Sequence, residues 1–121
     1  MVRYVAKVLV LLVVAAGLGG TTVAATAGEV SLRIVNVVSP QDVKIWEPTS
    51  IVAKKGDTVV LQLVNRHADE HGFEIAAFNV KEVVPGEKTS TVKFVADKAG
   101  IFPIKCQLHP AHVTGQLLVL E

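Results

Sequence analysis

The residues of this chain with the clearest chemical potential are one cysteine and three histidines. Cys106, His109 and His112 follow one another at intervals of three, and His71 lies thirty-five residues before the cysteine. A thiolate and imidazoles are ligands that suit transition metals, copper above all, rather than magnesium or calcium. The four residues therefore predict a site for one copper ion, Cu(I) or Cu(II), with His71, Cys106, His109 and His112 as metal ligands.

The N-terminal residues 1–27 predict an export signal. Arg3 and Lys7 precede or begin an apolar stretch, and small residues at the ends of the triplet 25–27 predict that cleavage leaves residues 28–121 as the mature domain. An uncleaved membrane anchor is the alternative, because the apolar and small residues together approach spanning length. Either way, we expect a periplasmic or secreted domain.

The composition of the mature domain excludes several partners. Removal of the signal takes away Arg3 and Lys7 from twelve basic residues and leaves all eleven acidic ones, so the formal charge becomes −1. This balance gives no basic surface for nucleic acid or for an anionic membrane. We expect a redox partner protein, no nucleic acid and no membrane contact after cleavage, and a homo-oligomer is compatible with the sequence.

The single cysteine supports the metal interpretation. Small exported domains often contain disulfides, which require cysteines in pairs, whereas Cys106 is the only cysteine here. A free thiol in an oxidising compartment has to be buried, paired with another chain or bound to a metal. The nearby histidines favour the metal, and a buried inert thiol is the alternative.

The pattern of the mature region predicts short strands separated by turns. Residues 30–38 alternate between apolar and polar, and residues 58–65 are rich in β-branched side chains. Pro103 predicts that its strand lies at an edge, an end or a bulge. We expect an all-β sandwich of about seven to eight strands, with strands near 30–38, 51–53, 58–65, 72–78, 88–95, 101–106 and 115–120.

Other residues near the site have less specific interpretations. His67 is predicted to be a solvated loop residue, and Glu70 to face solvent because neighbouring residues of an extended segment point apart. Trp46 is expected to fill one end of the core. Met1 is the only methionine and belongs to the signal, so no thioether ligand is available. The fourth ligand is then His112, water or a backbone carbonyl, or it is absent.

Several segments resemble the cupredoxins, a family of copper proteins. They are His71-Gly72-Phe73, Val84-Pro85-Gly86-Glu87, the run from Phe94 to Phe102, and Cys106-Gln107-Leu108-His109-Pro110. Within the family the pattern is most similar to the nitrosocyanins, red copper proteins that share Ala-Asp-Lys-Ala-Gly-x-Phe and Cys-Gln-Leu-His-Pro. The resemblance implies a cupredoxin-like Greek-key β-sandwich, and it implies that Cys106, His109 and His112 are ligands. His71 falls where nitrosocyanins have a glutamate ligand and where blue copper proteins have their first histidine.

The function expected from these features is one-electron transfer by an exported mononuclear copper protein. It would be an electron carrier rather than an enzyme. The alternatives are an open copper site that binds or converts a small molecule such as nitric oxide, a copper carrier, and a zinc-bound or metal-free adhesion-like sandwich.

Overall fold

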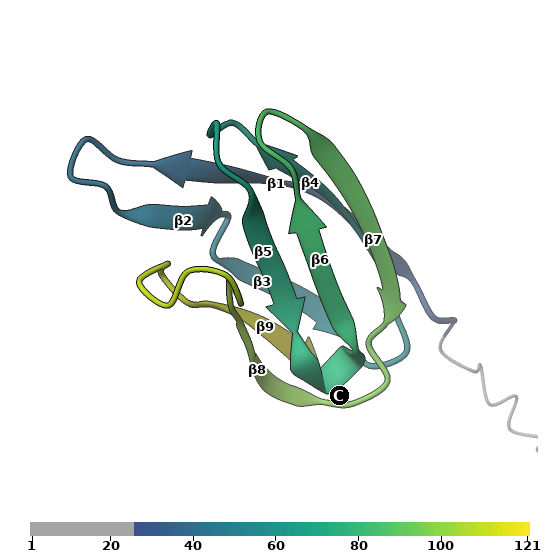
Figure 1. Cartoon of the computed structure of the whole chain (residues 1–121). Coiled ribbons are helices and arrows are strands. Elements are labelled where there is room, and N and C mark those ends of the chain that lie inside the picture. The colour runs from purple at the N-terminus through teal and green to yellow at the C-terminus, as the bar shows by residue number, and fades with distance from the viewer. Residues whose placement is uncertain (1–25) are drawn as a thin grey trace, which may run out of the picture.

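The chain forms a β structure of nine strands and one short 3₁₀ turn within the part that the computed structural model describes, residues 26–121 (Figure 1). The predicted export signal and its alternative, the anchor, lie almost wholly outside these residues. No helix among residues 26–121 is long and apolar enough to cross a membrane. The elements are β1 (Glu29–Val38), β2 (Lys44–Glu47), β3 (Ser50–Lys54), β4 (Thr58–Asn65), β5 (His71–Ile75), the turn η1 (Ala76–Phe78), β6 (Val80–Val84), β7 (Thr89–Val95), β8 (Gly100–Ile104) and β9 (Gly115–Leu120).

The strands form two sheets and a hairpin. One sheet has the order β2-β1-β4-β7 and the other the order β3-β9-β8, while β5 pairs with β6. The β1–β4 and β3–β9 pairs are parallel, which requires the crossovers of a Greek-key sandwich. A bridge between Glu74 and Lys105 attaches the hairpin to the end of β8. The predicted fold class is confirmed.

One apolar core lies between these layers because alternate residues of each strand point inward. In β4, Val59, Leu61 and Leu63 are buried while the residues between them are more exposed. The other sheet contributes Ile51 and Leu117, and the hairpin contributes further apolar side chains to the same cluster. The core therefore holds β5 rigidly at one side of the sandwich.

Two strands were not expected from the sequence, and one proline was placed correctly. β2 has only four residues and β6 five, so neither carries a long alternating pattern. β5 ends at Ile75, where the chain enters the turn η1, although a strand to residue 78 was predicted. β8 is an edge strand of its sheet, which confirms the position predicted from Pro103.

The loop between β8 and β9 closes one end of the sandwich. Figure 1 shows this loop beside β2, and the Val113 amide donates a hydrogen bond to the Lys44 carbonyl at 2.8 Å. Trp46 of β2 is buried beneath it and packs edge-on against Phe73, with ring centroids 5.6 Å apart. The expected core role of Trp46 is confirmed, and this end of the molecule carries the candidate ligands.

Candidate metal centre

The loop after β8 turns twice and so directs its three candidate ligands inward. The His109 amide donates to the Cys106 carbonyl at 3.4 Å, and the His112 amide donates to the His109 carbonyl at 2.9 Å. Each turn brings a residue back over the one three positions earlier. The spacing of three therefore has the structural consequence expected from the sequence. His71 enters the same space from the first position of β5.

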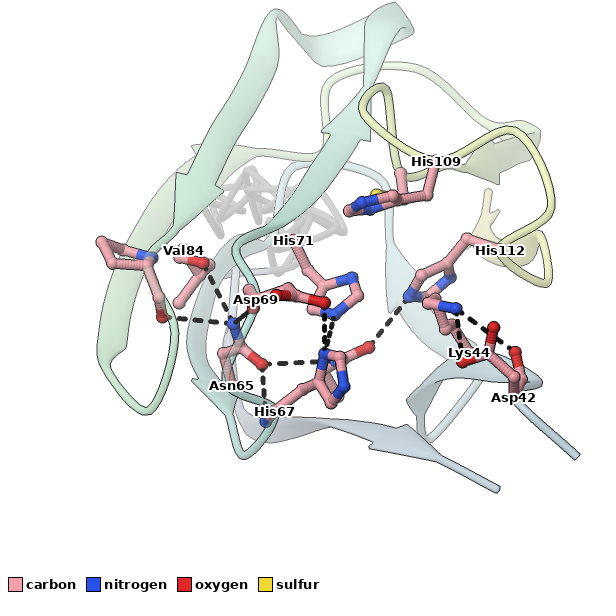
Figure 2. Close-up of polar contacts among 12 residues, drawn as sticks. Asp42, Lys44, Asn65, His67, Asp69, His71, Val84, His109 and His112 are labelled. Atoms are coloured by element: carbon pink, nitrogen blue, oxygen red, sulfur yellow. Dashed lines mark hydrogen bonds and ion pairs between the residues drawn. The ribbon is translucent and has the colours of Figure 1, made fainter. Parts of the chain in front are cut away.

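The four predicted ligands lie together in the structure. One donor atom from each of His71, Cys106 and His112 lies within 4.8 Å of the other two. The Cys106 Sγ is 3.4 Å from Nδ1 of His109, and the His109 and His71 rings are 4.8 Å apart between centroids. Figure 2 shows His71, His109 and His112 around a common space. The donor set is one sulfur and up to three imidazole nitrogens.

The backbone of Gly72 holds the two sides of the centre together. Its N–H donates to Sγ of Cys106 at 3.1 Å, and its carbonyl accepts from Nε1 of Trp46 at 2.9 Å. A side chain at this position would collide with Gln107, because an added Cβ would lie 2.2 Å from Gln107 Oε1. To admit a Cβ at this position, the Gln107 amide, which donates to the Glu82 carbonyl at 3.0 Å, would have to move.

The His71 ring has the surroundings expected of a metal ligand. It is 0% exposed, and among the described residues its Nδ1 has no hydrogen-bond partner. Its other nitrogen, Nε2, lies 3.2 Å from Nδ1 of His67. Buried polar atoms are nearly always satisfied, so an orphaned imidazole nitrogen beside a thiol is what a copper or zinc ion would complete.

The surroundings also keep His71 neutral, as a metal ligand must be. The pKa of His71 is lowered to about 4, first by burial and then by the neighbouring His109, His112 and His67 rings, which repel a positive charge. Deprotonated imidazole offers its lone pair to a metal without first releasing a proton.

The His112 ring is buried, but both its nitrogens approach protein oxygens. Nε2 lies 2.9 Å from Oδ1 of Asn36, and Nδ1 lies 3.3 Å from the Val113 carbonyl. Burial lowers the pKa of His112, and the Val113 carbonyl opposes this shift. His112 is only 5% exposed, although it lies in a loop.

Three residues around the centre were missed or misjudged in the sequence. His67 was expected to be solvated, yet its side chain is 30% exposed and packs against His71. Asn36 and Asn65 are buried and form a polar chain that reaches His112. Their only signal in the sequence is an asparagine at an inward position of each strand. Glu70, by contrast, is exposed as expected.

The chain is similar to known proteins in sequence and in fold. A family model described as a cupredoxin-like domain matches residues 8–119. Since the match spans most of the chain, the protein belongs to the cupredoxin-like family. A fold with a His71, Cys106 and His112 cluster supports copper binding.

The chain also matches short segments of two enzymes. Over 56 residues it is 46% identical to the nitrous-oxide reductase of Cupriavidus necator and 41% identical to that of Ralstonia nicotianae. Each match covers 44% of this chain but only 9% of the enzyme. The chain therefore corresponds to a small part of these enzymes.

Solved structures share its fold at low sequence identity. A copper nitrite reductase from Nitrosomonas europaea superposes with a TM-score of 0.66 and 18% identity, over 76% of this chain and 41% of the enzyme. The metal-binding domain of the Streptococcus pneumoniae Cu(I)-exporting P-type ATPase CopA, solved with Cu(I), gives 0.65 and 14% identity, over 81% of this chain and 92% of that one. These likenesses define the fold.

The lowered pKa of His71 predicts that the metal-free protein loses stability in acid. Between pH 6.5 and about 4 the unfolded state binds a proton that the folded state excludes. The free energy of unfolding is retained above this range and falls within it, by up to about 1.4 kcal/mol per pH unit. Denaturant titrations at about pH 7.5 and about pH 4.5 measure the loss. His71→Leu should show a smaller loss, and an equal loss in both proteins would contradict the assignment.

Proposed function

We propose that this protein is an exported one-electron carrier whose redox group is a single copper ion held by His71, Cys106, His109 and His112. The observation that carries the proposal is the buried Nδ1 of His71, which lacks a hydrogen-bond partner among residues 26–121 and lies in a cluster with a thiol. The ion would supply the change between Cu(I) and Cu(II). Cys106 would supply the soft ligand that favours Cu(I), and the imidazoles would serve both states.

The protein matrix suits such a carrier because it holds the donors still. The strand β5 fixes His71, and the end of β8 fixes Cys106. The chain would therefore rearrange little when the copper ion changes its charge. The Gly72 N–H on the sulfur would stabilise a thiolate. Burial of His71 and Cys106 shields these two ligands from water.

His109 is the ligand best placed to pass an electron to a partner protein. It is half-buried, whereas His71 and His112 are buried. Pro110 and Ala111 beside it are exposed, and so is Leu108. A redox partner could thus approach the edge of this ring over a small apolar surface, which suits a weak and short-lived complex.

The loop pattern supports a place near the nitrosocyanins, but the candidate ligands differ. His71 occupies the buried position beside the thiol, and Glu70 is exposed. We therefore propose that the centre has three imidazoles and no carboxylate. A second candidate function is small-molecule binding at an open position, which is favoured by the engagement of both His112 nitrogens with protein oxygens.

Signal cleavage before Gly28 is compatible with the start of β1. The Gly28 nitrogen donates to Oδ1 of Asp57 at 2.9 Å, and Lys54 N–H donates to the other carboxylate oxygen. These two donors, that of Lys54 first, lower the pKa of Asp57. An α-ammonium group created at Gly28 would make the same contact with an ionised partner.

Export should therefore yield a chain that begins at Gly28. The full sequence would be expressed in a Gram-negative host, and the intact mass of the periplasmic protein measured. The expected mass is that of residues 28–121. A mass that retains residues 1–27, with the protein in the membrane fraction, would show an anchor instead.

Copper binding through the thiol predicts a spectroscopic loss in Cys106→Ser. The copper-loaded protein should absorb intensely in the visible range through charge transfer from the thiolate, and serine cannot provide this transition. The control is Ala111→Ser, an exposed change on the same loop, which should keep the band. A band that survives in Cys106→Ser would exclude a copper–thiolate centre.

The assignment of His71 rather than Glu70 as a copper ligand predicts that variants at these two positions differ in copper binding. His71→Ala should weaken copper binding at least tenfold and open the centre to added imidazole or azide, because it removes a buried donor. Glu70→Gln should change neither the copper affinity nor the spectrum, since Glu70 is exposed. Copper titrations of both variants test this, and the opposite pattern would assign the centre to the carboxylate-ligated red copper class.

A further inference from the structure

The hydrogen-bond contacts of the buried His112 ring affect how strongly this candidate fourth ligand can bind a metal. Figure 2 shows a dashed line at the nitrogen of His112 on the side of the ring that faces His71. This nitrogen is Nε2, which lies 2.9 Å from Oδ1 of Asn36. The other nitrogen, Nδ1, faces the carbonyl of the next residue, Val113, at 3.3 Å. The nitrogen on the side of the other ligands is therefore already engaged by an amide oxygen.

The orientation of the Asn36 amide follows from its neighbour Asn65. These two residues are register partners on the parallel strands β1 and β4. Nδ2 of Asn65 lies 2.7 to 3.2 Å from the carbonyls of Asp69, Val84 and Pro85. Carbonyls only accept, so this atom has to be the donating NH₂ group and the opposite atom has to be the oxygen.

The same reasoning extends along the chain to His112. Oδ1 of Asn65 accepts from the His67 amide at 3.0 Å and from Nδ2 of Asn36 at 3.3 Å. A flipped Asn36 would place two amide oxygens against each other. Oδ1 of Asn36 therefore faces His112, and Nε2 of His112 has to carry the hydrogen.

A nitrogen that carries this hydrogen cannot donate its lone pair to a metal at the same time. Binding through Nε2 would require His112 to lose its proton there and its bond to Asn36. Asn36 and Asn65 are 0% and 1% exposed, so no water would replace the lost partner without rearrangement. A metal ion and the asparagine chain thus compete for one atom.

We propose that Asn36 is a positioning residue that makes His112 a weak and displaceable copper ligand by holding its Nε2 hydrogen. The proposal rests on the proposed copper centre. In the absence of the Asn36 oxygen, Nδ1 can carry the hydrogen towards Val113, and Nε2 becomes free to bind. The type of copper site would then be set by a residue that does not touch the ion.

The first test uses metal-free protein and is independent of copper. Long-range ¹H–¹⁵N correlation spectra of the ¹⁵N-labelled protein near pH 8 identify which nitrogen of a neutral histidine carries the hydrogen. We expect the Nε2–H form for His112. Asn36→Leu, which has a similar size but no acceptor, should shift His112 towards the Nδ1–H form, and Asn36→Asp, which keeps an acceptor, should retain Nε2–H. An Nδ1–H form in the unmodified protein would overturn the proposal, even if Asn36→Leu failed to fold.

The second test uses the copper-loaded protein and added imidazole. The unmodified centre should bind imidazole, and Asn36→Leu should weaken this binding about fivefold or more, because the released bond is an ordinary buried hydrogen bond. In a His112→Ala background, Asn36→Leu should have no such effect. An equal effect in both backgrounds, or stronger imidazole binding in Asn36→Leu, would contradict the competition. A protein that binds no copper would instead refute the proposed function and leave the first test valid.

Discussion

The arrangement of the centre depends on the backbone N–H and carbonyl of Gly72. This residue receives the Trp46 indole N–H on one side and gives its own N–H to the Cys106 sulfur on the other. The residue before it is His71, whose ring faces the same sulfur. The backbone of one residue thus links a ligand of β5 to a ligand of the loop after β8, and the core under β5 holds that backbone in place.

This constraint explains how a small domain can keep polar donors in its interior. Burial of a neutral imidazole with an unsatisfied nitrogen costs free energy, and the apolar core of both sheets offsets that cost. As a result, the donor atoms are already assembled before a metal binds. The lowered pKa of His71 has the same origin. Its surroundings disfavour the protonated ring and leave the neutral ring able to bind a metal ion.

Much of the sandwich could be predicted because long strands repeat their pattern. The alternation in β1 and the β-branched residues of β4 predicted both strands nearly to the residue, and Pro103 indicated an edge. The short strands β2 and β6 escaped because four or five residues hold too few alternations. The candidate ligands could be chosen by residue type and spacing, since turns in the loop after β8 act on residues three apart.

The residues around the ligands could not be predicted in the same way. Asn36 meets Asn65 because β1 and β4 are parallel and in a particular register, and it meets His112 across 76 positions of sequence. His67 approaches His71 through the shape of one loop. Such contacts depend on tertiary structure, and a single sequence carries no sign of them.

The central claim is that copper is bound by the one thiolate together with imidazoles. X-ray absorption at the copper edge of the copper-loaded protein tests this directly, because scattering by sulfur differs from scattering by nitrogen or oxygen. The account predicts one short copper–sulfur distance, which can come only from Cys106 in the mature domain, together with two or three imidazole nitrogens. A shell of nitrogen and oxygen alone would contradict it.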